Sequence, residues 1–480
     1  MTGGRAVSGP TTAIVLAAGA GSRFGGRKLL AMLDGRPILQ HVLDSLALAG
    51  IDDPVVVVGV DAQALEIAID WRRARRVLNP DPERGLASSL RLGWEAAIAV
   101  EPRPMAVLVV LGDQPRVGPD VIWALAAEPL DPQRPVVVAL HADGARNPVR
   151  LEPEADALVA QATGDRGLGP LLHARPELVR TIMAGGANAD IDAPGDLVAA
   201  LADAWAARVR ANASQVERLR EVPDGPDFYA TVTRTFVADP ARTDDAVLDA
   251  LIALARPGDT WLDIGAGAGR YALPLARSVR EVIALDPSRS MLESLGDAMS
   301  THANHNIRTI EGRWPPGGAI RDAIGPNPVS DVALIAHVGY DIEPIVPFLD
   351  AMEAAAQRLC VAVLMEQSPA SIAGPFWPLV HGEPRIPLPA LPQFLELLVA
   401  RGRRPNVMRL RGERRSWADR EELLAFLRRQ LWTVPGSAAD GRLLDAVAAL
   451  TATGDRGAIE VRGAEPHAVG VVTWAARSSV

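Results

Sequence analysis

The feature that most constrains the fold of this chain is an alternation of strand-like and helix-like segments, which occurs twice along the sequence. In the first half, apolar runs such as "AIVLAA" and "MAVLVVLGD" alternate with amphipathic segments such as "PILQHVLDSLALAG". The alternation begins again near residue 245, where a helical pattern leads into the strands "TWLDIG" and "EVIALD". Because alternating strands and helices form α/β units, the sequence predicts two Rossmann-like α/β domains with parallel sheets. Each domain should have three layers, with helices on both faces of its sheet (αβα).

The segment between the two halves predicts where the domains divide. Asp196–Val222 is rich in Ala and Arg, has a helical pattern and ends at the turn-rich "PDGPD". We place the boundary near residue 205, which gives a first domain over 1–205, a helical linker over 206–226 and a second domain over 227–480. A length of 480 residues suits two domains.

Composition excludes several classes of partner. The net charge of −9 comes without any Lys- or Arg-rich tail, so we expect no nucleic-acid partner. The single cysteine, Cys360, lies in an apolar run and excludes an internal disulfide. No apolar stretch has transmembrane length, and the first one lacks the charged start of a signal peptide, so we expect no membrane partner and a cytoplasmic protein.

The first glycine-rich turn, "LAAGAGSRFGGRKLL" (Leu16–Leu30), contains the only lysine of the chain, Lys28, against 48 arginines. Its small residues let backbone amides approach a polyphosphate closely. Arg23 and Lys28 add positive charge to the same loop. A lysine presents a compact, mobile point charge where an arginine presents a broad planar fork, so its retention here points to a distinct chemical task.

Aspartates after two other strands predict the opposite wall of that site. Asp113 in "LGDQP" follows the most hydrophobic strand, and Asp190 and Asp192 follow another in "ADIDAPGDL". Ligands in open α/β sheets bind at the carboxyl ends of the strands, where carboxylates can hold Mg²⁺ against phosphate oxygens. Lys28 and Arg23 would neutralise charge on an α-phosphate and a leaving pyrophosphate. The alternative for any one of these acids is a turn-forming aspartate.

The segment from Thr12 to about Ala200 resembles the MobA-type nucleotidyltransferases, and most closely the molybdenum cofactor cytidylyltransferases. The resemblance lies in the turn, "NPDPERGLASSL", "LGDQP", "ARNPVRL", "GDRGLGPLL" and "DIDAPGDL", in that order. It implies that Lys28, Arg23 and Asp113 are catalytic, that Asp113 and Asp192, with Asp190, hold Mg²⁺, and that Arg166 binds the acceptor. It also implies nucleotide contacts from Leu16, Ala17, Ala18, Gly19, Gly21, Ser22, Ser88 and Ser89.

The reaction that the resemblance implies is transfer of CMP from CTP to the phosphate of molybdopterin cofactor, with release of pyrophosphate. A molybdenum hydroxylase would then be a partner. "LAAG" rather than "LAGG" favours the cytidylyl over the guanylyl branch. Other members of the wider fold activate sugar or alcohol phosphates, and this alternative stays open.

The second glycine-rich turn, "DTWLDIGAGAGRYALPLA", has the spacing D-x-G-x-G-x-G. An acid ends the next strand, where it can accept hydrogen bonds from both ribose hydroxyls of a nucleoside. The pattern resembles the class I methyltransferases, which bind S-adenosylmethionine (SAM), from about Asp227 to Val480, and implies a seven-stranded sheet. A dinucleotide site or a degenerate site is the alternative. The SAM-binding residues predicted here are Asp263, Gly265, Gly267, Gly269 and Asp286.

The same resemblance places Arg313 and Trp314 of "EGRWPP" beside the adenine, and it predicts a final antiparallel strand pair in "GAIEVRG" and "AVGVVTWAA". His337 is a candidate base, with a structural histidine as the alternative. The Pro-rich segment Ser368–Pro392 is a candidate cover for the methyl acceptor. The sequence does not indicate what is methylated, and a SAM-binding domain without catalysis is a second alternative.

Overall fold

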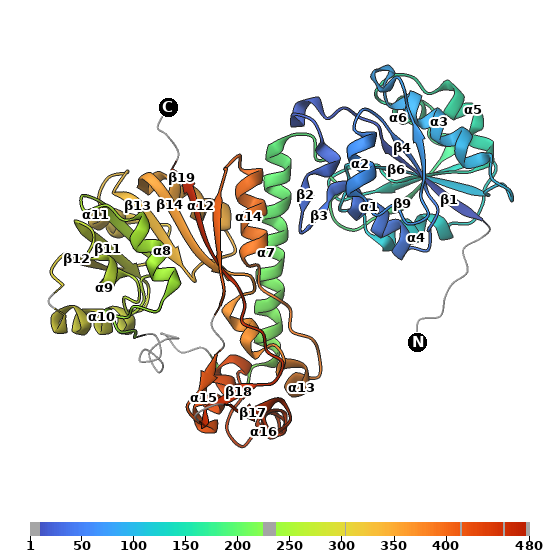
Figure 1. Cartoon of the computed structure of the whole chain (residues 1–480). Coiled ribbons are helices and arrows are strands. Elements are labelled where there is room, and N and C mark those ends of the chain that lie inside the picture. The colour runs from blue at the N-terminus through green and yellow to red at the C-terminus, as the bar shows by residue number, and fades with distance from the viewer. Residues whose placement is uncertain (1–9, 224–236, 303, 413–414, 455–456, 477–480) are drawn as a thin grey trace. The chain divides into compact units, whose positions relative to one another are not determined.

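The computed structural model describes residues 10–223, 237–302, 304–412, 415–454 and 457–476. The chain folds into two compact units, Met1–Ala200 and Leu201–Val480. Each unit contains a seven-stranded sheet with helices on both of its faces, as Figure 1 shows. The predicted fold class, two three-layer α/β domains, is therefore confirmed.

The sheet of the first unit has the strand order β5-β4-β1-β6-β8-β7-β9. Most of its pairings are parallel, as expected, but β8 pairs antiparallel with both β6 and β7. The sheet is therefore mixed. Its strands are β1 (Thr11–Ala17), β4 (Val55–Val58), β5 (Arg75–Leu78), β6 (Ala106–Leu111), β7 (Val136–Leu140), β8 (Val149–Leu151) and β9 (Val179–Met183).

One face of this sheet packs against α3, whose Ala87, Leu90 and Trp94 are buried over Ile14 of β1 and its neighbours. Gly93 of α3 lies so close to Ile14 that a Cβ atom there would overlap the isoleucine side chain. This close packing sets the distance between helix and sheet. The helices of the unit are α1 (Ile38–Leu48), α2 (Ala62–Ala68), α3 (Leu86–Ile98), α4 (Pro119–Ala127), α5 (Asp156–Gln161) and α6 (Gly169–Ala174), with a short hairpin of β2 (Met32–Leu33) and β3 (Arg36–Pro37).

The sheet of the second unit has the order β12-β11-β10-β13-β14-β19-β15, in which β19 is antiparallel to both of its neighbours. The predicted antiparallel pair is wrong in one member. β19 lies in "AVGVVTWAA" as expected, but its edge partner is β15, and the strand in "GAIEVRG" belongs to another sheet. The strands are β10 (Thr260–Ile264), β11 (Glu281–Asp286), β12 (Ile307–Glu311), β13 (Ser330–Ala336), β14 (Ala356–Met365), β15 (Asn406–Leu410) and β19 (Val469–Ala475).

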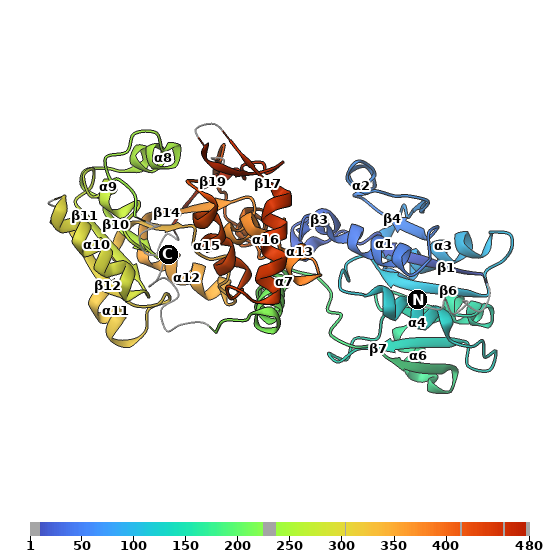
Figure 2. The ribbon, with the colours of Figure 1, turned by 90° about the horizontal axis from the view of Figure 1, so that it is seen from below.

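The helices of the second unit form two groups. Those around the large sheet are α8 (Ala246–Leu254), α9 (Ala272–Leu275), α10 (Arg289–Thr301), α11 (Gly318–Ile324), α12 (Ile345–Ala355) and α14 (Leu391–Ala400). A smaller group has its own apolar core and gathers to one side of that sheet in Figures 1 and 2. It contains α13 (Trp377–His381), α15 (Arg420–Leu431), α16 (Ala438–Leu450) and the short sheet of β16 (Ser416–Trp417), β17 (Thr451–Thr453) and β18 (Ile459–Val461).

The long helix α7 (Pro194–Leu219) runs through the point where the two units divide. Beyond Ala200 it packs on the second unit, where the indole N–H of Trp205 donates to the carbonyl of Ile342 at 2.9 Å. Most of the predicted linker, 206–226, is thus a helix lying on the second unit, and residues 224–226 fall outside the described residues. In the part of the chain that the structure describes, no helix combines the length and apolarity needed to span a membrane.

Candidate functional site

The first candidate site lies at the carboxyl edge of β1 and β6, which are adjacent, parallel and paired through Leu16 and Leu111. After β1 the chain forms two single turns of 3-10 helix, Ser22–Phe24 and Lys28–Leu30. Gly21 makes this possible because its φ of 58° is left-handed, and a Cβ there would lie 3.1 Å from the Cβ of Lys28. The glycine therefore lets the loop fold tightly against Lys28.

Lys28 is the central side chain of this site. It is only 9% exposed, and its Nζ donates to Asp113 Oδ2 at 2.5 Å and to Asp192 Oδ1 at 3.0 Å. Burial alone would lower the pKa of Lys28, but the charges and hydrogen bonds of the two carboxylates outweigh burial and raise it. Lys28 is therefore a protonated ammonium held between two acids.

Arg23 and Asp190 flank this cluster without joining its hydrogen bonds. Arg23 Nη1 lies 3.9 Å from Asp192 Oδ2, and its side chain is 83% exposed, so this pair contributes little to stability. Asp190 Oδ1 accepts from Gln114 Nε2 at 2.7 Å. Loss of water and the nearby charge of Asp113 raise the pKa of Asp190. Arg23 is thus free to move toward a ligand, whereas Asp190 is held by protein.

The carboxylates suit Mg²⁺ as a partner of bound phosphate. In the described part of the chain, no three His, Cys, Asp or Glu side chains are grouped as a ready-made metal site. Mg²⁺ commonly takes only one or two protein carboxylates, together with water and substrate phosphates. Asp113 and Asp192 already contact one shared cation, the Lys28 ammonium. Their spacing and oxygen chemistry fit that mode of binding.

Ser88 and Ser89 lie at the start of α3, and both are buried. Asn79 Nδ2 donates to both hydroxyl oxygens at 2.9 Å, a role that sequence reasoning missed. Asn79 directly follows β5 at the same sheet edge, which was the signal that could have identified it. The amide of Ala87 donates to the carbonyl of Gly164 at 3.1 Å, so the "GLASSL" and "GDRGLGPLL" segments are in contact.

A pocket of about 200 Å³ opens beside this site, and Arg166 contributes to its wall. Leu16 and Leu111, from the ends of β1 and β6, form part of its apolar surface. Arg146 also lines the pocket, although the sequence did not single it out. The structure therefore places Arg166 in a small apolar pocket that adjoins the glycine-rich turn.

The second candidate site is the turn after β10. Gly265, Gly267 and Gly269 all have left-handed φ values, of 81°, 55° and 84°. Side chains of Val338 and Leu295 occupy the Cβ positions of Gly265 and Gly269, but nothing lies within 4 Å of the Cβ position of Gly267. Gly267 therefore leaves space in which a ligand can approach the backbone.

Two aspartates underlie this turn. Asp286 Oδ2 accepts from the amide of Gly267 and its Oδ1 accepts from that of Ser288, both at 2.8 Å. Asp263 Oδ1 is buried and has no hydrogen-bond partner among the described residues. Burial and the charge of Asp286 raise the pKa of Asp263 to about 7. The open glycine cradle and the unpartnered acceptor fit a nucleoside ligand such as SAM.

The remaining predicted residues lie further along the same sheet edge. Trp314 follows β12, and its Nε1 donates to the carbonyl of Phe348 at 3.1 Å, whereas Arg313 is exposed. His337 follows β13 with a left-handed φ of 59°. Burial, together with the charge of Arg270, lowers the pKa of His337 to about 4. Such a histidine is a poor base near neutral pH, which favours the structural alternative.

Comparison with known proteins finds a family match in each half of the chain. Residues 13–179 match the family model of the MobA-like NTP transferase domain. Residues 262–313 match a methyltransferase domain. The chain therefore carries a MobA-like NTP transferase domain joined to a methyltransferase domain.

Three curated relatives show how varied these similarities are. The bifunctional protein GlmU of Sorangium cellulosum is 35% identical over 124 residues, which are 24% of this chain and 25% of GlmU. Nicotine blue oxidoreductase of Paenarthrobacter nicotinovorans is 29% identical over 182 residues, 36% of this chain and 85% of that protein. CMP-5'-(3-aminopropyl)phosphonate synthase of Streptomyces rubellomurinus is 35% identical over 153 residues, 28% of this chain and 24% of the synthase. The chain thus spans about a quarter of the length of the first and third relatives.

Solved structures resemble the chain in part. Rv0371c of Mycobacterium tuberculosis is 28% identical, with 39% of this chain and 95% of that protein covered at a TM-score of 0.35. YcgJ of Bacillus subtilis is 14% identical, with 48% of this chain and 98% of that protein covered at a TM-score of 0.36.

Proposed function

We propose that the first domain is a Mg²⁺-dependent cytidylyltransferase, which transfers CMP from CTP to the phosphate of molybdopterin cofactor in the cytoplasm and releases pyrophosphate. The observation that carries this proposal is the ammonium of Lys28, the only lysine of the chain, held between Asp113 and Asp192. A molybdenum hydroxylase is the proposed recipient of the product.

The reaction requires control of negative charge around one phosphorus atom. An oxygen of the acceptor phosphate forms a bond to the α-phosphorus of CTP, and the bond from that phosphorus to the bridging oxygen of pyrophosphate breaks. The protonated Lys28 would neutralise charge on the α-phosphate, and the exposed Arg23 can turn toward the leaving phosphates. Asp113 and Asp192 would hold Mg²⁺, which when bound would neutralise negative charge on the phosphates.

The acceptor side is assigned to the pocket that contains Arg166. Arg146 and Arg166 supply positive charge there, and leucines of β1 and β6 supply an apolar surface. An acceptor with a phosphate attached to a flat ring system would match both, because its phosphate would pair with the arginines and its ring would lie against the leucines. The pocket of about 200 Å³ would hold only part of such an acceptor.

The direct test is to incubate the full chain with CTP, Mg²⁺ and molybdopterin cofactor and to measure pyrophosphate release. We expect Lys28→Ala to lower turnover by about 100- to 1000-fold, the usual effect of removing one group that stabilises transition-state charge. Arg27→Gln is the matched control, because Arg27 is the adjacent basic residue and is exposed. If Lys28→Ala turned over as fast as the wild-type enzyme, the role proposed for Lys28 would be wrong.

The alternative acceptor is a sugar or alcohol phosphate, or a phosphonate, with a second domain that binds SAM without catalysis. The similarity to CMP-5'-(3-aminopropyl)phosphonate synthase favours this alternative, because the name of that synthase describes a CMP derivative of a small phosphonate. Pyrophosphate release measured with CTP, GTP or UTP and each of these acceptors distinguishes the two hypotheses. A molybdopterin enzyme should release no pyrophosphate with sugar phosphates.

For the second domain the proposed function is SAM-dependent methylation of a small molecule. The open space at Gly267 and the acids Asp263 and Asp286 beneath the turn support it. Calorimetry with SAM tests binding, and an activity screen then distinguishes a methyltransferase from a SAM-binding domain without turnover.

A further inference from the structure

A second, larger pocket lies in the methyltransferase domain at the carboxyl end of β14. Its volume is about 670 Å³, within the range of small-molecule sites. Met365, the last residue of β14, and Val469, the first of β19, pair with each other and both line it. The amide of Met365 donates at 2.8 Å to the hydroxyl of Tyr340, which follows β13. The pocket therefore lies at the sheet edge where open α/β sheets bind ligands.

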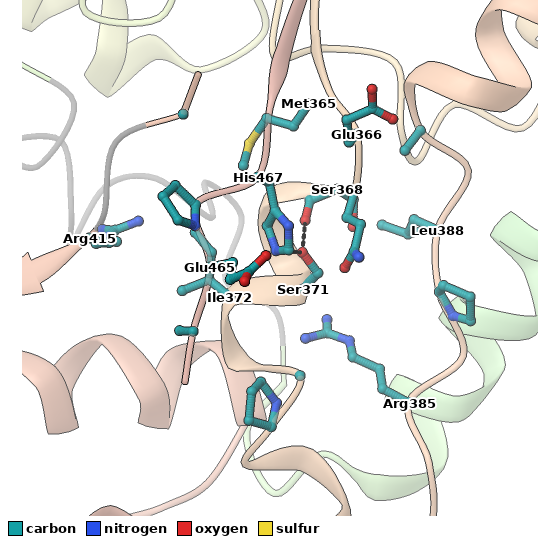
Figure 3. Close-up of a pocket in the computed structure, with 18 of the residues that line it drawn as sticks. Met365, Glu366, Ser368, Ser371, Ile372, Arg385, Leu388, Arg415, Glu465 and His467 are labelled. Carbon is teal, nitrogen blue, oxygen red and sulfur yellow. Dashed lines mark hydrogen bonds between the residues drawn. The ribbon is translucent and has the colours of Figure 1, made fainter. Parts of the chain in front are cut away.

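The segment Ser368–Pro392, predicted to cover an acceptor, forms much of the wall of this pocket. Because each proline ring fixes its own φ, such a wall is largely preformed before a ligand binds. Met365, Ile372 and Leu388 add apolar side chains, as Figure 3 shows. The prolines that line the pocket are Pro375, Pro378, Pro384, Pro387, Pro392 and Pro466.

Arg385 brings a positive charge into this apolar surrounding. Its guanidinium lies over the ring of Trp377 at 4.6 Å, and Nη1 donates to the carbonyl of Ala370 at 2.7 Å. In Figure 3 the side chain points into the pocket toward Ser371. Burial lowers the pKa of Arg385 to about 10. No Asp or Glu among the described residues forms an ion pair with it, so Arg385 is a partly desolvated cation without an ion-pair partner.

Two acids close to Arg385 in the sequence or in the pocket lining, Glu383 and Glu366, have other partners. Glu383, two residues earlier, accepts from Arg218 Nη2 at 2.5 Å and from Gln215 Nε2 at 2.8 Å. Glu366, in the pocket wall, lies 3.4 Å from Arg409. The lining contains three arginines, Arg208, Arg385 and Arg415, and two acids, Glu366 and Glu465, so it has more positive than negative side chains.

Helix α7 fixes the backbone on both sides of Arg385. Gln215 Nε2 donates to the carbonyl of Pro384, and Gln215 Oε1 accepts from the amide of Ile386, both at 2.8 Å. Asn212 Nδ2 donates to the carbonyl of Ile386 at 2.5 Å. Gln215 and Asn212 are buried. These contacts identify Gln215 as a positioning residue for Arg385.

A polar pair occupies the middle of the same pocket. Ser371 Oγ donates to the carbonyl of Ser368 at 2.6 Å, and His467 Nε2 lies 3.2 Å from that hydroxyl oxygen (Figure 3). Since the hydroxyl has one proton and gives it to Ser368, His467 Nε2 is the donor in this contact. A ligand with one further polar group would find a partner here.

We propose that this pocket binds a small organic acid with an apolar body, whose acid group pairs with Arg385 while its body lies against the proline-rich wall. This acid would also be the methyl acceptor, and that role alone rests on the function proposed for the second domain. The anion binding itself rests on Arg385 and the pocket.

The test uses three probes that differ only in the acid group: 4-hydroxyphenylacetate, 4-hydroxybenzylphosphonate and the uncharged 4-hydroxyphenylacetamide. Each is titrated calorimetrically into the full chain. We expect one charged probe or both to bind about 10- to 100-fold more tightly than the amide, because a hydrogen-bonded ion pair replaces an unpaired charge. Tighter binding of the carboxylate than of the phosphonate, or the reverse, distinguishes the two acid classes.

Arg385→Gln should abolish the tighter binding of the charged probes, and Arg385→Lys should keep part of it. Gln215→Ala should weaken this tighter binding, although it leaves the charge of Arg385 in place. Arg289→Gln, a change at a surface arginine of α10 that is 76% exposed, is the control and should behave as wild type. The proposal is overturned if the charged probes bind no more tightly than the amide, or if their preference survives in Arg385→Gln. SAM is titrated in parallel, so a failure of SAM binding, which would count against the function proposed for this domain, is seen separately.

Discussion

The two glycine-rich turns have the same place in their domains, at the carboxyl edge of a central parallel strand, but different charged side chains lie beside them. After β1, the ammonium of Lys28 is inserted between Asp113 and Asp192, and the pKa of the lysine is raised. After β10, the acids Asp263 and Asp286 lie beneath the turn, and the pKa of Asp263 is raised to about 7. One turn therefore carries a fixed positive charge and the other lies over carboxylates.

This difference shows that the backbone of a strand–glycine–helix unit does not by itself select a ligand. Neighbouring strands and loops supply the charges that do so. Lys28 between carboxylates suits a triphosphate with its metal, whereas Asp286 beneath an open glycine suits a ligand that donates hydrogen bonds, as ribose hydroxyls do. The following changes test this contrast, beginning with the largest expected effect.

Asp113→Asn keeps the shape of the side chain but removes the charge that lies nearest to Lys28. We expect pyrophosphate release to fall by about 100-fold or more, because the change weakens both the partner of Lys28 and one of the proposed metal ligands. Rates are measured at saturating CTP over a series of Mg²⁺ concentrations. Asp120→Asn, a change at an exposed residue in the first turn of α4, is the control and should retain full activity. Wild-type rates for Asp113→Asn at every Mg²⁺ concentration would contradict the role proposed for Asp113.

Gly267→Ala places a methyl group in the space that the second turn leaves open. We expect SAM to bind about 10-fold more weakly or worse, because the Cβ occupies space needed by the ligand and disfavours the left-handed φ. Calorimetry measures the affinity. The matched control is Gly258→Ala, where the Cβ also meets nothing within 4 Å and φ is not left-handed. Unchanged SAM affinity in Gly267→Ala would mean that the ligand lies elsewhere.

Asp263→Asn tests the acidic character of the second turn through pH. The pKa of Asp263 is about 7 in the folded chain, against 3.8 as the ordinary value. Because the pKa of Asp263 is raised in the folded chain, binding of its proton favours the folded state. This contribution to the free energy of unfolding is complete below about pH 4 and is lost as pH rises through 7. At about 1.4 kcal/mol per pKa unit, the loss is on the order of 4 kcal/mol at most.

Asparagine cannot ionise, so the variant should melt at a higher temperature relative to wild type at pH 8 than at pH 5. Melting curves of the two full-length proteins at both pH values measure this difference. An identical melting difference at pH 5 and pH 8 would show that Asp263 does not titrate in this range.

The sequence allowed much of this arrangement to be predicted, for a simple geometric reason. The carboxyl ends of parallel strands meet at one edge, so residues after β1 and β6, such as Lys28 and Asp113, were expected to converge, and they do. The same rule placed Asp263 and Asp286 together, because β10 and β11 are adjacent and parallel. The roles of these residues remain predictions.

What could not be predicted depends on pairings that local periodicity does not encode. β8 has only three residues, and nothing in its apolar pattern distinguishes antiparallel from parallel pairing. The partner of β19 is selected by packing at the sheet edge, which brings in β15 from a segment that showed no strong strand pattern. Asn79 looked like a turn residue until the fold brought it to Ser88 and Ser89.

The central claim is that the first domain needs a single compact ammonium at the position of Lys28, between Asp113 and Asp192. The measurement that tests it most directly is pyrophosphate release from CTP by Lys28→Arg. An arginine keeps the positive charge and can still pair with both carboxylates, but its planar fork cannot follow phosphate oxygens as a point charge can. We expect turnover to fall by about 100-fold, close to the effect of Lys28→Ala. A Lys28→Arg enzyme with wild-type turnover would contradict the claim.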